Sequence, residues 1–259
     1  MATAEPAGHL VVVGTGPGPA AHMTPEATAA VAGAEWLFGY GPYLDRLALR
    51  PDQLRVASDN REELDRARAA LAAAADGRRV AVVSGGDPGV FAMAAAVCEA
   101  MEAGPAAWRQ VDFSVLPGVT AMLAVAASVG APLGADFCAL SLSDNLKPWA
   151  VIERRLLAAA DAGFVMALYN PVSRARPWQL GRAFGVLRRV LPDEVVVVFG
   201  RAAGRPDARM QITTLGEARA GMADMATCVL IGSRSTRLIA RPGRPPLVYS
   251  PRSVGGEVS

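Results

Sequence analysis

The sequence predicts an α/β protein of two domains, each a sheet flanked by helices. Short runs of β-branched residues alternate with alanine-rich stretches of helical character, which is the pattern of layered α/β folds. The chain has 259 residues, 52% of them hydrophobic, which is enough for two cores. Glycine and proline near Pro132 favour a linker there. We expect an N-terminal domain over residues 1–132, a C-terminal domain over 133–245 and a flexible tail over 246–259.

The first domain is expected to contain five strands and one especially clear helix. That helix follows Asn60, which can cap it, while Glu63 completes the capping pair and Gly77 can end it. The expected strands lie at residues 10–13, 36–40, 54–57, 80–84 and 111–116.

The second domain continues the alternation, and we expect parallel α/β layers in it as well. Helices are predicted over residues 149–160 and 178–190. The strands are expected at residues 137–142, 164–169, 194–199, 210–214 and 227–231.

The glycine-rich loop after the first strand, "GTGPGPAAHMT", raises the question of a dinucleotide site. Pro17 and Pro19 have no backbone N–H, so the loop offers few of the donors that hold a pyrophosphate. The strand at 36–40 also lacks the terminal acid that would hold a ribose. These features disfavour a nicotinamide-dependent oxidoreductase.

Composition restricts the other classes of function. Two histidines and three dispersed cysteines match neither a metal site nor a disulfide framework, so no metal is expected. No apolar stretch is long enough to cross a bilayer and the N-terminus lacks the order of a secretion signal, so we expect a cytoplasmic protein without a membrane partner. The net charge of +2, with arginines clustered in the second half, favours an anionic small molecule over nucleic acid.

Polar and glycine-rich loops follow several strands, and ligands of open α/β sheets bind at such carboxyl ends. Gly85 and Gly86 permit close backbone approach, and Asp87 adds a carboxylate that could instead cap the next helix. Thr120 and Asn170 follow two further strands, although each also fits an ordinary turn.

In order, the motifs Gly14–Gly18, Gly85–Pro88, Pro117–Ala121, Tyr169–Pro171 and Thr213–Leu215 resemble the tetrapyrrole (corrin/porphyrin) methylase family, over about residues 10–241. The resemblance implies two α/β domains with S-adenosylmethionine in the cleft between them, usually in a homodimer. By match, Gly85, Gly86, Asp87 and Val90 would surround the methionine part, and Pro17, Thr120 and Ala121 would line the cofactor site. Asn170, Thr213 and Thr214 would hold the adenosine side.

Within the family, the segments at 139–149, 168–180 and 229–237 are most similar to members that act in cobalamin (vitamin B12) biosynthesis. Those members methylate precorrin-3B at ring carbon 17 and drive ring contraction to precorrin-4. Methylation of the cobalt-bearing intermediate, of another corrin position, or of RNA or protein remains an alternative.

The same resemblance points to residues for substrate and proton handling. Ser141, Ser143 and Asp144 leave a strand and are candidates for moving protons during ring contraction, although a serine and an aspartate here could equally cap a helix. Precorrins carry a rim of carboxylates, which suits bidentate pairing with arginine. The candidates for substrate binding are Gly14, Gly16, Arg174, Arg176 and Arg234, with exposed surface arginines as the commoner alternative.

Overall fold

The computed structural model describes residues 8–59, 62–173 and 175–253. The chain folds into two compact units, Met1–Thr120 and Ala121–Ser259. The division therefore lies ahead of the boundary expected near Pro132. The reason is helix α5 (Ala121–Val129), which packs on the second sheet: a Cβ built on Gly200 would lie 2.1 Å from a methyl carbon of Val125.

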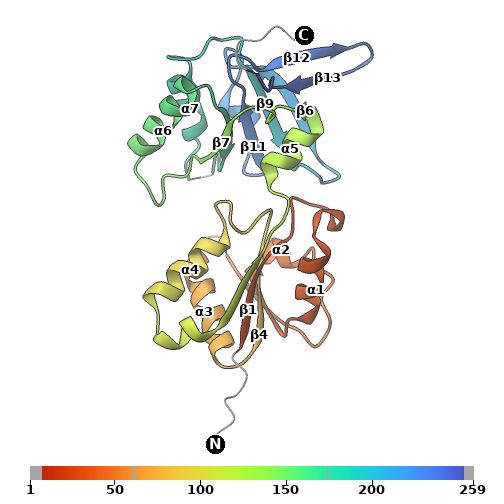
Figure 1. Ribbon diagram of the computed structural model, residues 1–259, viewed down its shortest axis with the longest axis vertical. Coiled ribbons are helices and arrows are strands. Elements are labelled where there is room, and N and C mark those ends of the chain that lie inside the picture. The colour runs from red at the N-terminus through yellow and green to blue at the C-terminus, as the bar shows by residue number, and fades with distance from the viewer. Residues whose placement is uncertain (1–7, 60–61, 174, 254–259) are drawn as a thin grey trace, which may run out of the picture. The chain divides into compact units, whose positions relative to one another are not determined.

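Unit 1 contains a parallel sheet in which β1 and β4 lie side by side (Figure 1). The strand order is β3-β2-β4-β1-β5. Every strand lies where the alternation of apolar residues predicts it. The strands are β1 (His9–Gly14), β2 (Trp36–Tyr40), β3 (Leu54–Ser58), β4 (Arg79–Ser84) and β5 (Asp112–Leu116).

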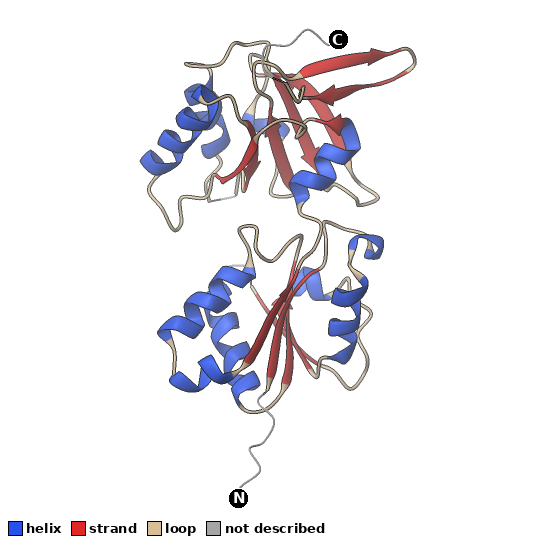
Figure 2. Cartoon of the chain, in the orientation of Figure 1, coloured by secondary structure: helices blue, strands red, loops and turns tan. Residues whose placement is uncertain are grey.

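Helices cover both faces of this sheet (Figure 2), because successive strand residues point to opposite sides. In β1, Leu10 and Val12 pack toward α3 and α4, whereas Val11 and Val13 pack toward α1 and α2. The predicted cap Asn60 lies outside the described residues. The helical elements are η1 (Ala20–His22), α1 (Pro25–Gly33), α2 (Gly41–Leu44), α3 (Glu63–Ala75), α4 (Met93–Ala103) and η2 (Ala106–Gln110).

Unit 2 contains a mixed sheet with the strand order β10-β9-β11-β8-β7. Only β7 and β8 are parallel, and the pairs β8/β11, β11/β9 and β9/β10 are antiparallel. The expectation of parallel layers is therefore correct for unit 1 and wrong for unit 2. The strands are β7 (Phe137–Ser141), β8 (Val165–Tyr169), β9 (Val196–Arg201), β10 (Arg209–Thr214) and β11 (Thr227–Ile231).

One face of the second sheet carries the largest core cluster, in which α6 (Trp149–Asp161) and α7 (Gln179–Leu187) pack on the strands. Leu156, Phe184 and Phe199 are fully buried there. The rings of Phe184 and Phe199 meet edge to face, with centroids 6.1 Å apart. The short helix η3 (Ala220–Met222) contributes apolar side chains to the rim of this core.

A small second sheet completes unit 2 and replaces part of the expected flexible tail. It has the order β12-β13-β6, formed by β12 (Arg237–Arg241), β13 (Arg244–Tyr249) and β6 (Gly130–Ala131). Residues 246–249 are held because β13 pairs with both neighbours and Val248 is buried. Within the described part of the chain, no helix is long and apolar enough to span a membrane.

Candidate functional site

In unit 1, the loops after β1 and β4 are joined by backbone hydrogen bonds at the carboxyl edge of the sheet. The Thr15 amide donates to the Ser84 carbonyl at 2.9 Å. Gly16 and Gly86 exchange a reciprocal pair, with N···O distances of 3.1 and 2.8 Å. The two glycines adopt φ values of +70° and +67°, which favour glycine. The structure thus brings the first two glycine motifs together.

Asp87 connects this edge to the loop after β5. Its Oδ1 accepts from the Gly89 amide at 2.8 Å and its Oδ2 from the Gly118 amide at 3.1 Å. Helix α4 begins later, after Ala92, and has no side-chain cap. Asp87 therefore does not cap that helix; its carboxylate holds two loops of the edge in place.

Close backbone contacts explain why glycine occupies this edge. A Cβ on Gly118 would lie 2.3 Å from the Gly86 carbonyl oxygen, and a Cβ on Gly14 would lie 2.6 Å from the Gly118 nitrogen. A Cβ on Gly86, in contrast, would meet nothing nearer than 3.8 Å. The backbone of Gly86 is accordingly open to a close ligand, while Gly14 and Gly118 let the loops approach each other.

The other residues predicted for this region lie around the same edge. Val90 and Pro17 are partly exposed, and Thr120 is 5% exposed at the end of the unit. The backbone and Cβ of His22 lie close to Gly16, and the His22 Nδ1 is buried without a partner among the described residues. From the sequence, His22 is expected to be a solvated loop residue, and the burial of its Nδ1 differs from this expectation, because a single histidine in a loop carries no signal of burial.

In unit 2, the ends of β7 and β8 place two polar side chains in contact. The Asn170 amide Nδ2 donates to the Ser141 hydroxyl at 2.9 Å. Asn170 has φ +51°, an uncommon conformation for a residue other than glycine, and Ser141 is 7% exposed. The Ser143 amide also donates to the Ser141 hydroxyl, at 3.3 Å.

Beside this pair, Asp144 binds one residue of the loop that leads into α7 and the first residue of α7. Its Oδ1 accepts from Arg176 Nη1 at 2.8 Å and from Gln179 Nε2 at 2.8 Å. The side chains of Arg176 and Asp144 are 25% and 24% exposed, whereas Gln179 is 1% exposed. Arg174 lies outside the described residues. Five of the predicted polar residues therefore lie together: Ser141, Ser143, Asp144, Asn170 and Arg176.

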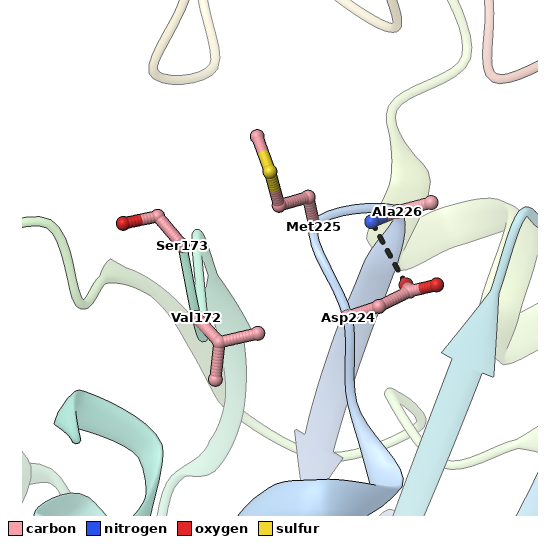
Figure 3. Close-up of a pocket in the computed structure, with 5 residues that line it drawn as sticks. All are labelled: Val172, Ser173, Asp224, Met225 and Ala226. Carbon is pink, nitrogen blue, oxygen red and sulfur yellow. Dashed lines mark hydrogen bonds between the residues drawn. The ribbon is translucent and has the colours of Figure 1, made fainter. Parts of the chain in front are cut away.

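A pocket of about 410 Å³ opens between the loop after β8 and the loop before β11. Figure 3 shows Val172 and Ser173 on one side, and Asp224, Met225 and Ala226 on the other. The Ser173 hydroxyl oxygen is buried and has no hydrogen-bond partner among the described residues. In Figure 3 this hydroxyl points away from Asp224, Met225 and Ala226, so it does not face the space between the two walls.

Asp224 fixes the second wall of this pocket. Its Oδ1 accepts from the Ala226 amide and the Thr227 hydroxyl at 2.9 and 2.8 Å, and its Oδ2 from Arg201 Nε at 2.7 Å. Partial burial raises the pKa of Asp224, but the hydrogen bonds from Thr227 and Arg201 outweigh it and leave the pKa below its usual range. Nearby, Ala202 has φ +49° and its amide donates to the Ala226 carbonyl at 2.9 Å.

Three predicted residues lie at the opposite edge of the same sheet. Since β10 and β11 run antiparallel to β8, their ends lie beside the start of β8 rather than beside Asn170. Thr213 and Thr214 are therefore not brought to Asn170. Arg234 follows β11, and its Nη2 donates to the Val190 carbonyl.

The antiparallel direction also explains why the pocket was not predicted. The start of β11, not its end, lies beside the carboxyl end of β8. Sequence reasoning searched only the ends of strands, so residues 224–226 were missed.

Unit 1 has glycine-rich loops at the carboxyl edge of its parallel sheet, and unit 2 has polar loops after its parallel strands β7 and β8. This arrangement is typical of α/β proteins that bind small ligands at the ends of parallel strands. The comparisons with known proteins narrow this class. Residues 9–219 match the family of Tetrapyrrole (Corrin/Porphyrin) Methylases, and the chain belongs to this family.

Individual relatives agree with this membership. The chain is 69% identical to a precorrin-3B C(17)-methyltransferase of Sinorhizobium sp, over 96% of the chain and 98% of the relative. It is 39% identical to a probable cobalt-factor III C(17)-methyltransferase of Salmonella typhimurium, over 88% of the chain and 93% of that protein. The crystal structure of the methyltransferase CobJ matches with a TM-score of 0.89 and 50% identity, covering 94% of the chain and 100% of CobJ.

Proposed function

We propose that the chain transfers a methyl group from S-adenosylmethionine to carbon 17 of precorrin-3B, with ring contraction to precorrin-4, in cobalamin biosynthesis. The observation that carries this proposal is the high identity, across both units, to the Sinorhizobium enzyme named for that reaction. The lower identity to the relative named for cobalt-factor III favours the metal-free substrate.

In unit 1, the edge built by Gly85, Gly86, Asp87 and Val90 is the part we assign to the methionine portion of the cofactor. The open backbone beside Gly86 and the fixed carboxylate of Asp87 support this assignment. A carboxylate there suits an ammonium group. Pro17 and Thr120, with the adjoining Ala121, are assigned to the same cofactor contact, and Gly14 and Gly16 shape the loop beside it.

In unit 2, the pocket beside Asn170 is the part we assign to the adenosine portion. Its walls combine the apolar side chains of Val172 and Met225 with the polar Asp224, which suits a flat, polar ring. We assign the adenosine contact to these residues rather than to Thr213 and Thr214, because Thr213 and Thr214 lie at the other edge of the sheet.

S-Adenosylmethionine supplies an electrophilic methyl group, so the displacement needs no nucleophile from the protein. The chain's own contribution is alignment of the reacting atoms, which can be worth roughly 7–11 kcal/mol. Ring contraction also requires proton movement, for which a positioned group adds about a hundred- to ten-thousand-fold. We assign this step to Ser141, whose oxygen accepts from Asn170 and Ser143 and whose own proton is left to donate.

The test is methyl transfer with labelled S-adenosylmethionine and precorrin-3B, followed by mass analysis of the tetrapyrrole. For the wild type, we expect the labelled methyl group in a tetrapyrrole whose ring has contracted. The variant Ser141→Ala should still methylate but should contract the ring more slowly. Calorimetry with S-adenosylhomocysteine and NADH provides an independent check, and binding of NADH alone would contradict the proposal.

A further inference from the structure

The contacts of Asp144 are those of a residue that holds its neighbours in place. One oxygen, Oδ1, receives both the guanidinium of Arg176 and the amide of Gln179, each at 2.8 Å. Gln179 is the first residue of α7 and is almost completely buried, so its amide orientation is fixed by packing. Asp144 is thus held between a buried amide and an arginine.

Arg176 uses only one of its nitrogens for these contacts. Nη1 donates to Asp144 Oδ1 and to Asn145 Oδ1. Among the described residues, Nε and Nη2 have no hydrogen-bond partner. Nε–H and Nη2–H form one side of the planar guanidinium, and two parallel donors of this kind match a carboxylate.

The backbone of Arg176 is fixed as well. Its amide donates to the Ser173 carbonyl at 3.1 Å, and the Ser173 amide donates to the Arg176 carbonyl at 3.2 Å. This reciprocal pair closes the loop after β8. Both ends of the arginine, the backbone and Nη1, are therefore held before a ligand arrives, which reduces the entropic cost of binding.

Nearby charges favour an anion at this place. Burial lowers the pKa of Lys147, Arg155 lowers it further, and Asp144 opposes both effects. The attraction between Lys147 and Asp144 places one further positive charge near the Asp144–Arg176 pair. A carboxylate that pairs with Arg176 would meet this charge at a site that is only about one-quarter exposed.

We infer that Asp144 and Gln179 are positioning residues, which hold the Nε–Nη2 side of Arg176 toward a carboxylate of the tetrapyrrole rim. Asp144 transfers no proton in this arrangement. The inference rests on the proposed function for its ligand, and it assigns two residues to substrate recognition rather than to ring contraction.

A double-mutant cycle tests the inference. Asp144→Asn and Arg176→Met should each raise KM for precorrin-3B about tenfold, the cost of one charge-assisted pair, with kcat nearly unchanged. Because Asp144 acts through Arg176, the double variant should be no worse than Arg176→Met alone. The Kd for S-adenosylhomocysteine should stay unchanged in all three.

Two further variants separate positioning from simple loss of folding. Gln179→Met keeps a similar volume and should raise KM by a smaller factor than Asp144→Asn, since Arg176 still holds Asp144. Arg182→Met is the matched control: it removes an arginine from the same helix, one that lies over the rings of Trp149 and Trp178 and does not contact Asp144. Its KM should equal that of the wild type.

The opposite result is equally specific. If Asp144→Asn lowers kcat, accumulates a methylated but uncontracted product, and adds its effect to that of Arg176→Met, then Asp144 handles a proton and the inference is wrong.

A binding measurement provides a second test. The Kd of uroporphyrin, a carboxylate-rich tetrapyrrole, is measured by fluorescence for the same set of variants. Unchanged Kd in both single variants overturns the inference, whereas failure of the wild type to turn over precorrin-3B overturns the proposed function instead.

Discussion

Replacing Gly118 by alanine tests whether the close packing of the loops in unit 1 builds the cofactor edge. The added Cβ would lie 2.3 Å from the Gly86 carbonyl oxygen, and ordinary contact begins at 3.4 Å. One of the two backbone segments must therefore move by about 1 Å. Both segments are fixed, since the Gly118 amide donates to Asp87 and Gly86 is paired with Gly16.

The magnitude follows from overpacking of a rigid site. We expect the free energy of unfolding to fall by about 1–3 kcal/mol. A displacement of this size at positioning groups can also cost up to about a hundredfold in rate. Urea titration measures the stability, calorimetry measures the affinity for S-adenosylhomocysteine, and steady-state kinetics measures methyl transfer. The affinity and the rate should both fall in Gly118→Ala.

Gly185→Ala is the matched control. Gly185 lies in the middle of α7, and a Cβ there meets nothing within 4 Å. This variant should gain about 1 kcal/mol from helix propensity and bind the cofactor product normally. If Gly118→Ala retains wild-type stability and affinity, the close contact does not build the site and the reasoning is refuted.

Three other outcomes are expected. Burial raises the pKa of the Cys228 thiol to about 12, so in native protein near about pH 8 peptide mapping should find Cys98, which is exposed, alkylated and Cys228 unmodified. The pKa of Asp224 is held below its usual range, so its contribution to stability is present above about pH 4 and is lost as the pH falls through the folded-state pKa. Asp224→Asn should accordingly lose about 1 kcal/mol at neutral pH in urea titrations and be less sensitive to acid, and equal acid sensitivity in both proteins would contradict this. Thr24 accepts from the Ala27 amide at 3.0 Å at the start of α1, so Thr24→Ala should lower the unfolding free energy by about 1 kcal/mol in thermal melts while Thr24→Ser should not.

The elements of unit 1 could be predicted from the sequence because local patterns determine them. Strand β2 occupies the predicted residues, since an apolar run between turn residues has few other ways to be buried. The loops after β1, β4 and β5 meet because parallel neighbours end at one edge. Gly86 and Asp87 were found for that reason.

The strand directions in unit 2 could not be predicted from the sequence in the same way. A run of β-branched residues predicts a strand but carries no direction, and the directions of β10 and β11 decide which residues lie beside Asn170. Thr213 and Thr214 are predicted from the family motif at residues 213–215, and such a motif carries no information about the edge of the sheet at which it lies. Gln179 was missed because its partner Asp144 is distant in sequence, and a glutamine at a helix start looks like an ordinary surface residue.

The most direct test of the proposed reaction is product analysis by mass spectrometry after incubation with S-adenosylmethionine and an equal mixture of metal-free precorrin-3B and its cobalt-bearing counterpart. We expect one added methyl group and a contracted ring in the metal-free tetrapyrrole, with the cobalt form left largely unchanged. Consumption of the cobalt form alone would contradict the assigned substrate, and transfer to neither would contradict the assigned reaction.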